Sequence, residues 1–286
     1  MTAKNLGESG ENPLVPNAKL RAMYTKMVEA RVLDEATIKR LKARGRRRIA
    51  TVRGQEAIRI STTTDLTEND LISDSKPSAA MGLLLGGDPA SLLRGLTQKK
   101  EDPKKAFSEA GVSRVLRSVD DEEDRLRYAA GAALALKSQG HRGILVAYAY
   151  KDEASRATWR RVLASAAKLE LPILFVVLSQ KSVRKSGAER AELCNLARTA
   201  GVPGIPVDAC DAVAVYRVVQ ESLGRMRGGD GPVLIESVSW RLEGARGGGT
   251  EDPLKHLKEF LLARKICDQA WFKQTDKAVR KRLSQK

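Results

Sequence analysis

The sequence predicts an α/β fold in which a doubly wound parallel sheet is covered by helices on both faces, with helical extensions at both ends. Strand-like apolar runs alternate with helical patterns throughout the second half of the 286 residues, which is the order that gives a parallel sheet. The composition is globular, with 42% hydrophobic and 30% charged residues. We expect a flexible tail over residues 1–16, a single domain over residues 17–286, and a C-terminal helical extension from about residue 252.

The N-terminal half is predicted to be mainly helical. Apolar residues recur at helical spacing over Leu20–Gly45, and a glycine ends the pattern. Residues Thr51–Thr64 are predicted to form a turn that enters a second helix, whereas Asp70–Gly87 shows a mixed pattern. Asp88 and the proline after it are typical of a helix N-cap and first turn. Asp120–Gly140 predicts a further helix, because acids fill its first turn and small apolar residues its middle.

The centre of the chain is predicted to be a βαβ unit. Two buried strands, Ile144–Ala149 and Ile173–Leu178, flank an amphipathic helix over about Glu153–Lys168. Ligands of such units bind where the strands end. Those ends are Tyr150-Lys151-Asp152 and Ser179-Gln180, and neither carries a Gly-rich phosphate-binding motif.

The rest of the chain continues the alternation of helices and strands. We expect a helix over Ala188–Ala200, a strand over Ile205–Val207, a helix from Asp211 to Met226, a strand over Gly231–Val238, a glycine-rich loop over Gly244–Gly249, and final helices over about Leu254–Arg264 and Asp268–Leu283. The loop lacks the Gly-Lys-Ser/Thr ending of a P-loop, so it is interpreted as flexible rather than phosphate-binding.

Cysteine and histidine usage argues against a disulfide framework and against a local metal site. The three cysteines (Cys194, Cys210 and Cys267) lie far apart, and the two histidines are His141 and His256. Reduced thiols fit a cytosolic protein. No apolar leader pattern occurs in the first residues and no apolar run has transmembrane length, so a cytoplasmic location is expected.

The formal net charge of +16 gathers in two stretches. Lys39–Arg48 holds seven basic residues in ten, and Lys273–Lys286 is a second basic stretch. Such stretches attract anionic partners, but cations are also favoured near helix C-termini. No recognition helix, zinc finger or aromatic-rich RNA motif accompanies the charge, so nucleic acid is not the expected ligand.

Seven segments, in this order, resemble the α subunit of thiamine-diphosphate-dependent 2-oxo acid dehydrogenases of the pyruvate and branched-chain type. They are YTKMVEARVLDE at Tyr24–Glu35, GQEA at Gly54–Ala57, AAGAALALK at Ala129–Lys137, LPILFVV at Leu171–Val177, GIPVDACDAVAVY at Gly204–Tyr216, GPVLIE at Gly231–Glu236 and the stretch Asp252–Trp271. The resemblance covers about Leu20 to Leu283 and implies the thiamine-diphosphate-binding fold.

The resemblance also shows where the cofactor motif has changed. In the family a Gly-Asp-Gly turn and, somewhat under thirty residues later, an Asn-Asn pair hold the diphosphate and Mg²⁺. Glycines let the backbone approach the phosphates, and carboxylate and amide oxygens ligate the metal. Placed on this chain, the first motif falls on Tyr150, Lys151 and Asp152, and the second on Ser179 and Gln180. The spacing is kept, but every identity has changed, and a lysine stands where Mg²⁺ needs an anionic ligand.

Two further segments depart from the family in the same direction. The segment Ile72–Gly82 has no aromatic residue and no histidine, although the family presents both to the cofactor there. The loop after the last strand usually carries a Gly-His pair, but here Gly244 is followed by Ala245. The resemblance therefore implies no bound cofactor, no metal and no catalytic residue. It leaves Lys151, Asp152, Ser179 and Gln180 as degenerate family positions.

Three hypotheses about function follow. The first is a dehydrogenase α-subunit-like protein that has lost thiamine diphosphate and Mg²⁺ and acts as a structural or regulatory subunit. The second is an active decarboxylating α subunit with an atypical cofactor site. The third is a module that binds an anion or nucleic acid through Lys151 and the arginines at 46–48.

Three structural interpretations accompany these hypotheses. Lys151 is expected to form an ion pair with Asp152, Glu153 or another nearby acid, and GQEA is expected to shape a turn. The small-residue helix Ala129–Leu136 is interpreted as a close-packing surface, with a subunit interface as one interpretation. The resemblance implies a homodimer, or a heteromer with an α- or β-like subunit.

Overall fold

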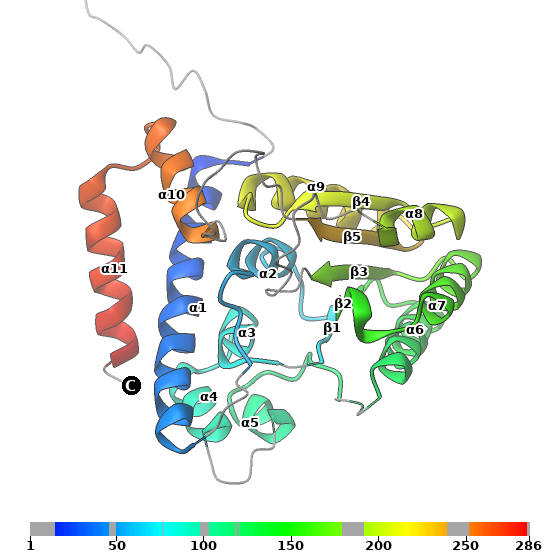
Figure 1. The fold of residues 1–286 in the computed structure, drawn as a ribbon, viewed down its shortest axis with the longest axis horizontal. Coiled ribbons are helices and arrows are strands. Elements are labelled where there is room, and N and C mark those ends of the chain that lie inside the picture. The colour runs from blue at the N-terminus through cyan, green and yellow to red at the C-terminus, as the bar shows by residue number, and fades with distance from the viewer. Residues whose placement is uncertain are drawn as a thin grey trace, which may run out of the picture.

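A five-stranded, wholly parallel sheet forms the centre of the protein (Figure 1). The computed structural model describes residues 15–45, 50–75, 77–97, 103–117, 119, 121–178, 192–238 and 252–284. The strands are β1 (Leu71–Ser73), β2 (Leu145–Tyr150), β3 (Ile173–Leu178), β4 (Gly204–Asp208) and β5 (Val233–Val238). Their order in the sheet is β1-β2-β3-β5-β4, so β1 and β4 form the two edges.

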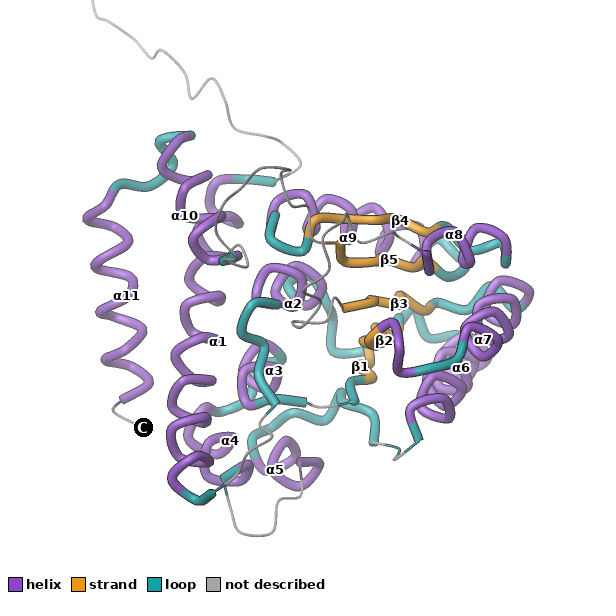
Figure 2. Tube along the Cα trace, in the orientation of Figure 1, coloured by secondary structure: helices purple, strands orange, loops and turns teal. Residues whose placement is uncertain are grey.

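Helices surround the sheet (Figure 2). They are α1 (Asn17–Ala43), α2 (Glu56–Thr63), α3 (Ala79–Leu84), α4 (Pro89–Leu96), α5 (Pro103–Glu109), α6 (Glu122–Ser138), α7 (Arg156–Lys168), α8 (Glu192–Thr199), α9 (Ala212–Arg227), α10 (Pro253–Ala263) and α11 (Gln269–Ser284), with a short 3-10 helix, η1 (Lys151–Glu153). No described helix is long and apolar enough to cross a membrane.

Each face of the sheet supports its own hydrophobic core, because successive strand residues point to opposite sides. In β2, Val146 and Tyr148 join the core formed with α1 to α5 and α9 to α11. Leu145 and Ala147 instead join the core formed with α6, α7 and α8. This two-sided burial confirms the predicted doubly wound parallel sheet.

The direction of strand connection reverses between β4 and β5. The helices α7 and α8, which follow β2 and β3, lie on one face, whereas α9 lies on the other and returns the chain to β5. Strands β3 and β5 are therefore neighbours in the sheet. The helix that follows β3, α8, lies on one face, and the helix that follows β5, α10, lies on the other. Such a switch point, at the carboxyl ends of the strands, is where open α/β sheets bind ligands. Leu178 and Val238 are the last described residues of these two strands.

Several sequence predictions are confirmed at the level of individual caps. Asp88 accepts a hydrogen bond from the Ser91 amide at 2.9 Å, and proline occupies the first turn of α4. The start of α7 differs from the prediction, because residues 151–153 form η1 and the helix begins only at Arg156. Ser155 is its N-cap, and the Ser155 hydroxyl accepts a hydrogen bond from the Thr158 amide at 3.2 Å. The mixed region also contains β1 and α3, whose three and six residues are too short for a periodic pattern.

The terminal helices are tied to the α/β core through α1. Arg31 on α1 donates to Glu56 of α2 at 2.8 Å, and both of its terminal nitrogens donate to Asp252, the N-cap of α10, at 2.7 and 2.8 Å. These hydrogen bonds from Arg31 lower the pKa of the Asp252 carboxyl. Single-domain organisation over residues 17–286 remains a prediction.

The carboxyl group of Asp34 makes the free energy of unfolding depend on pH. It is buried on α1, where the Thr51 hydroxyl and the Val52 amide donate to its Oδ2 at 2.5 and 2.6 Å. Burial outweighs these hydrogen bonds and raises the pKa of Asp34 to about 6. Since the native pKa lies above the unfolded value, the native state holds this proton more tightly, and the resulting stabilisation is lost as pH rises through about 6.

Replacing Asp34 with asparagine should remove this dependence. Between about pH 4.5 and about pH 7.5 the wild-type protein should lose about 2 kcal/mol of unfolding free energy relative to the variant. Urea unfolding of both proteins at the two pH values measures the difference, and other titrating groups cancel in it. Parallel pH profiles would contradict the assignment.

Candidate functional site

The candidate site lies where β2 ends and the chain turns through η1 into α7. The indole nitrogen of the buried Trp159, on α7, donates to the Lys151 carbonyl at 3.3 Å. Glu123 of α6 fastens the following turn by accepting from the Ser155 amide at 2.9 Å and the Thr158 hydroxyl at 2.8 Å. The hydrogen bond from the Ser155 amide is the largest cause that lowers the pKa of Glu123 to about 2. The turn between Lys151 and Ser155 is therefore held at its two ends by α7 and α6.

Lys151 forms an ion pair with α8. Its Nζ lies 3.0 Å from Glu192 Oε2, at the first residue of that helix, and both side chains are partly exposed. The partner is thus a nearby acid, as expected, but it comes from α8 and not from Asp152 or Glu153. An exposed pair of this kind contributes about 0–1 kcal/mol to stability. The Lys151 ammonium is therefore already paired with the Glu192 carboxylate.

Tyr150 connects the end of β2 to the start of α2. Its hydroxyl accepts a hydrogen bond from Gln55 Nε2 at 3.0 Å, and its side chain packs against the hydrophobic core. Gln55 belongs to the GQEA segment, in which Gly54 has a φ of +82° and donates its amide to Glu56 at 2.6 Å. The segment therefore shapes a turn, as the sequence indicates, and that turn supports Tyr150.

A buried pair of charges lies on the face of β2 that packs against α2 and α3. Arg59 on α2 donates to Asp74 at 2.5 Å, and its guanidinium stacks 4.1 Å from the ring centre of Tyr148. Burial raises the pKa of Tyr148 to about 12, and its hydroxyl is paired with Thr62 at 2.6 Å. These partners make the cluster a structural one.

A second buried pair joins η1 to α6 and to the segment after β1. Arg125 donates to Glu153 at 2.5 Å and to the Tyr148 carbonyl at 2.9 Å. The other carboxylate oxygen of Glu153 accepts from the Ser75 hydroxyl at 2.9 Å. Arg125 is 1% exposed, so both charges depend on each other for compensation.

The described residues of the site do not fit a magnesium diphosphate group. The lysine at position 151 cannot ligate Mg²⁺, and Tyr150 and Asp152 bring side chains where the family pattern has glycines. Among the described residues, no group of three or more His, Cys, Asp or Glu side chains could hold a metal ion. Ser179 and Gln180 lie outside the described residues, as do Gly244 and Ala245.

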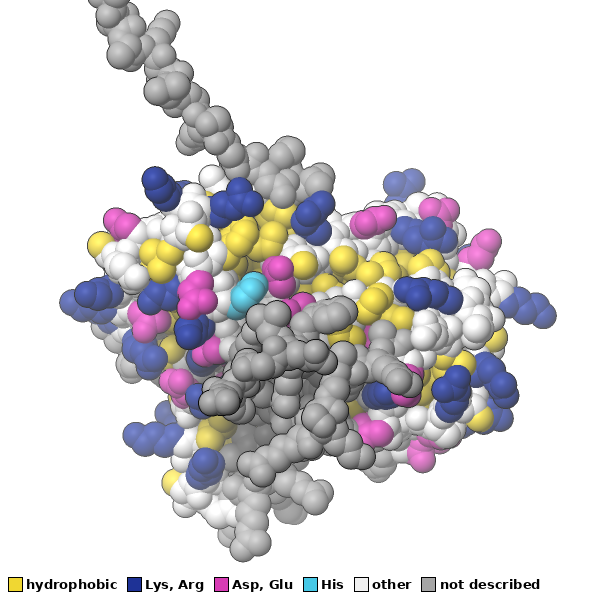
Figure 3. Space-filling view, turned by 45° about the horizontal axis from the view of Figure 1, so that its top comes forward, with side chains coloured by type: hydrophobic (Ala, Val, Ile, Leu, Met, Phe, Trp, Pro, Cys, Tyr) yellow, Lys and Arg dark blue, Asp and Glu magenta, His cyan; other side chains and the backbone are white. Residues whose placement is uncertain are grey.

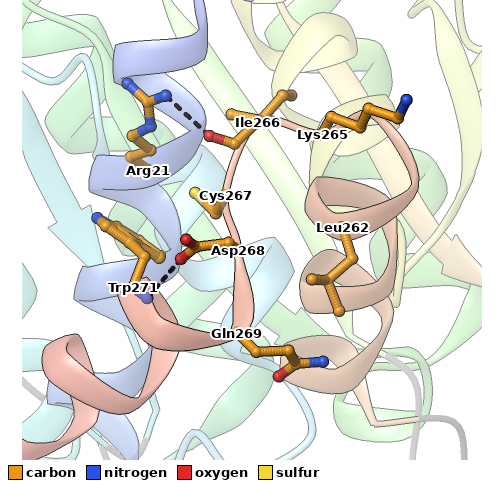
Figure 4. A pocket seen from close by; sticks show the side chains of 8 residues that line it. All are labelled: Arg21, Leu262, Lys265, Ile266, Cys267, Asp268, Gln269 and Trp271. Carbon is orange, nitrogen blue, oxygen red and sulfur yellow. Dashed lines mark hydrogen bonds between the residues drawn. The ribbon is translucent and has the colours of Figure 1, made fainter.

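A pocket of about 730 Å³ lies away from this site, where the turn between α10 and α11 meets α1 (Figure 4). It is lined by Arg21, Leu262, Lys265, Ile266, Cys267, Asp268, Gln269 and Trp271. Arg21 donates to the Ile266 carbonyl at 2.8 Å, and Asp268 caps α11 through the Trp271 amide at 2.7 Å. Two of its polar side chains, those of Arg21 and Asp268, are thus engaged in holding the turn between α10 and α11.

Comparison with known proteins identifies the family. Residues 24–246 match the family described as "Dehydrogenase E1 component". The chain belongs to this family. The match confirms the resemblance drawn from the sequence: it covers six of the seven segments, and the seventh, Asp252–Trp271, lies beyond it.

Individual relatives agree with this membership. The chain is 28% identical over 253 residues to the pyruvate dehydrogenase E1 component subunit alpha of Staphylococcus aureus, and 27% identical to that of Staphylococcus epidermidis. In both cases the alignment covers 85% of this chain, and it spans 66% of the length of the relative. A solved thiamin diphosphate-dependent enzyme from Mycobacterium smegmatis matches with a TM-score of 0.40 and 14% identity over 63% of this chain and 30% of the other, which is too distant to support an argument.

Sequence reasoning missed the partners of the site residues. Glu192 opens a helix 41 positions after Lys151 in the chain, and Arg125 and Glu153 are 28 positions apart. No local motif marks either pair. The available signal was weak. Lys151 directly follows a buried strand, where an acidic partner is favourable, and acidic residues in the segments after the neighbouring strands are the candidates.

Proposed function

We propose that this chain is an E1 α-subunit-like protein that does not hold thiamine diphosphate and Mg²⁺ and serves as a structural or regulatory subunit. The observation that carries the proposal is Lys151, which stands at the position of the family's metal-binding aspartate and is paired with Glu192 at 3.0 Å. Family membership gives the scaffold, whereas the residues at the strand end lack the chemistry that the cofactor requires.

The argument is electrostatic. A diphosphate with Mg²⁺ is stabilised when carboxylate and amide oxygens complete the metal's coordination and glycines allow close backbone approach. An ammonium could neutralise one phosphate charge, but only after it leaves Glu192. In this chain Tyr150 and Trp159 fix the same turn from both sides, so we expect little freedom for the backbone to form a phosphate cradle.

The proposed partner is a second copy or an E1 β-like chain. Support comes from α6, where Tyr128 and Leu134 are exposed, and from Leu169 just after α7. The Leu169 carbonyl accepts from Lys137 at 2.8 Å, which places Leu169 beside α6. A Cβ added at Gly131 would meet nothing within 4 Å in the described part, so packing within the chain does not require this glycine. A reducing compartment such as the cytoplasm is also proposed, since the cysteines are free thiols.

Calorimetric titration with thiamine diphosphate, with and without Mg²⁺, tests the cofactor proposal. We expect no heat of binding and no thermal shift in either condition. Mg²⁺-dependent binding would contradict the proposal and favour an active decarboxylating α subunit. Binding that ignores Mg²⁺, disappears in Lys151→Ala and persists in the control Lys168→Ala would show that the lysine replaces the metal.

Sedimentation of the same sample tests the proposed assembly. If the chain remains monomeric, both alone and when mixed with a β-like chain from the same source, the proposed assembly is contradicted.

A further inference from the structure

Asp34 is a buried acid at the place where α1 meets α3 and the segment that enters α2 (Figure 1). The acidic side chains visible in Figure 3 lie on the surface, where water solvates their charge, whereas Asp34 is 2% exposed. Its Oδ2 accepts two hydrogen bonds, from the Thr51 hydroxyl and the Val52 amide. Its Oδ1 is buried and makes no hydrogen bond to the described residues. The carboxyl group is therefore only half satisfied in this position.

Among the described residues, no cation is paired with Asp34. Glu56 of α2 is the acid that faces it, and this neighbour disfavours its ionisation. The helix α3 carries no charged residue, and its Ala80 amide favours the charged form only weakly. The cations of the neighbouring elements are engaged elsewhere or exposed: Arg31 binds Glu56 and Asp252, Arg59 binds Asp74, Arg280 binds Glu35, and Arg53 and Arg94 are exposed. An ionised Asp34 thus depends mainly on two hydrogen bonds, which do not compensate for its lost hydration.

The two donors of Asp34 begin the turn that enters α2. The Val52 carbonyl accepts a hydrogen bond from the Gln55 amide at 2.7 Å, which closes the turn. The Gln55 side chain in turn donates to the Tyr150 hydroxyl at 3.0 Å, at the end of β2. Asp34 therefore holds one end of a turn whose other end contacts the candidate site.

This turn can open without disturbing the helices on either side of it. Arg53 and Gly54 are exposed and Thr51 is half-buried, whereas every residue of α2 is buried. Segments with few buried contacts open locally at a lower free energy than the core does. The hydrogen bonds of Thr51, Val52 and Gln55 are thus the contacts that local opening would break.

We propose that Asp34 is a pH-sensitive switch that controls the turn Thr51–Gln55. When Asp34 is protonated, the neutral carboxyl keeps both hydrogen bonds without a buried charge, and the turn stays closed on Tyr150. When Asp34 is ionised, opening of the turn lets water solvate the charge, and Gln55 leaves Tyr150. The turn therefore opens more readily as pH rises, because ionisation is more favourable in the open turn than in the closed one.

The consequence reaches the candidate site. Gln55 is the assigned donor to the Tyr150 hydroxyl, and Tyr150 directly precedes Lys151. The proton on Asp34 thus controls how firmly the end of β2 is held from the side of α2. The proposal concerns the turn and does not depend on whether the chain binds thiamine diphosphate.

Amide hydrogen exchange, followed by NMR at about pH 5 and about pH 7.5, tests the switch. The Val52 and Gln55 amides report opening once the pH dependence of intrinsic exchange is corrected for. Burial raises the pKa of Asp34 to about 6 in the closed turn, against about 4 for a hydrated carboxyl, so the opening constant should rise about tenfold between the two pH values. In Asp34→Asn it should change less than about twofold. The matched control Glu35→Gln, which removes an exposed acid from the next position of α1, should keep the tenfold rise.

The proposal fails in any of three cases. An equal rise in the wild type and in Asp34→Asn would mean that another group titrates. The same rise for the amides of α7 would mean that the whole protein unfolds rather than the turn alone. Continued protection of the Gln55 side-chain amide at about pH 7.5, with Val52 open, would mean that opening stops short of Tyr150. Each comparison is a ratio within one variant, so a less stable Asp34→Asn protein still gives a decisive result.

Discussion

Replacing Arg125 with methionine is expected to destabilise the fold by about 3–5 kcal/mol. The guanidinium is buried, and its loss removes the 2.5 Å ion pair with the Glu153 carboxylate, which is buried too. Arg125 also donates to the Tyr148 carbonyl at 2.9 Å, so β2 loses a cross-link to α6 at the same position. Chemical denaturation of the purified variant measures the change.

The double variant Arg125→Met/Glu153→Gln separates the ion pair from packing. Because neither charge remains in the interior, the double variant should be more stable than the sum of the single losses predicts. The matched surface change Arg127→Met alters an exposed arginine of the same helix and should cost about 0–1 kcal/mol. A cost below about 1 kcal/mol for Arg125→Met would mean that water or a neighbouring donor compensates Glu153.

Truncation of Trp159 to alanine is expected to cost about 3–5 kcal/mol. The indole is 1% exposed, and its ring lies 6.1 Å from that of Phe175 on β3 in an edge-to-face arrangement. Removing it opens a cavity between α7 and the sheet and releases the Lys151 carbonyl that the indole nitrogen binds. Thermal and urea unfolding report the loss.

Trp159→Phe is the informative companion to this truncation. It keeps most of the ring and removes the hydrogen bond to Lys151, so a cost of about 1 kcal/mol is expected from that bond, with a further contribution from the smaller ring. If both variants lose equal stability, the hydrogen bond rather than packing fixes η1, contrary to the expectation.

The sequence was informative wherever a local rule decides the structure. Ile173–Leu178 is apolar at every position and forms β3 over that range, and Asp88 caps α4 because its side chain can reach the Ser91 amide. By contrast, β1 has three residues and pairs only with the distant β2 among the named strands. Its place in the sheet is set by tertiary contacts that no short window contains.

The site was predictable in position but not in pairing. A βαβ pattern places Lys151 at the carboxyl end of a strand whatever its side chain is. Its ion pair with Glu192 depends on how the segment after β3 brings α8 back to the sheet. The Arg125–Glu153 pair likewise depends on the approach of α6 to η1. Sequence spacing contains neither distance, so long-range charge pairs had to come from the three-dimensional structure.

The strand order also limits how copies of this protein can associate through the edges of the sheet. At one edge, the amide and the carbonyl of Ile72 in β1 are already hydrogen-bonded to Arg114 and Leu116, and at the other edge β4 carries an exposed proline, Pro206, whose nitrogen has no hydrogen to donate. A strand from another molecule would find too few backbone partners at either edge to extend the sheet. The fold is thereby protected against edge-to-edge aggregation, and specific association is left to the side chains of its helices.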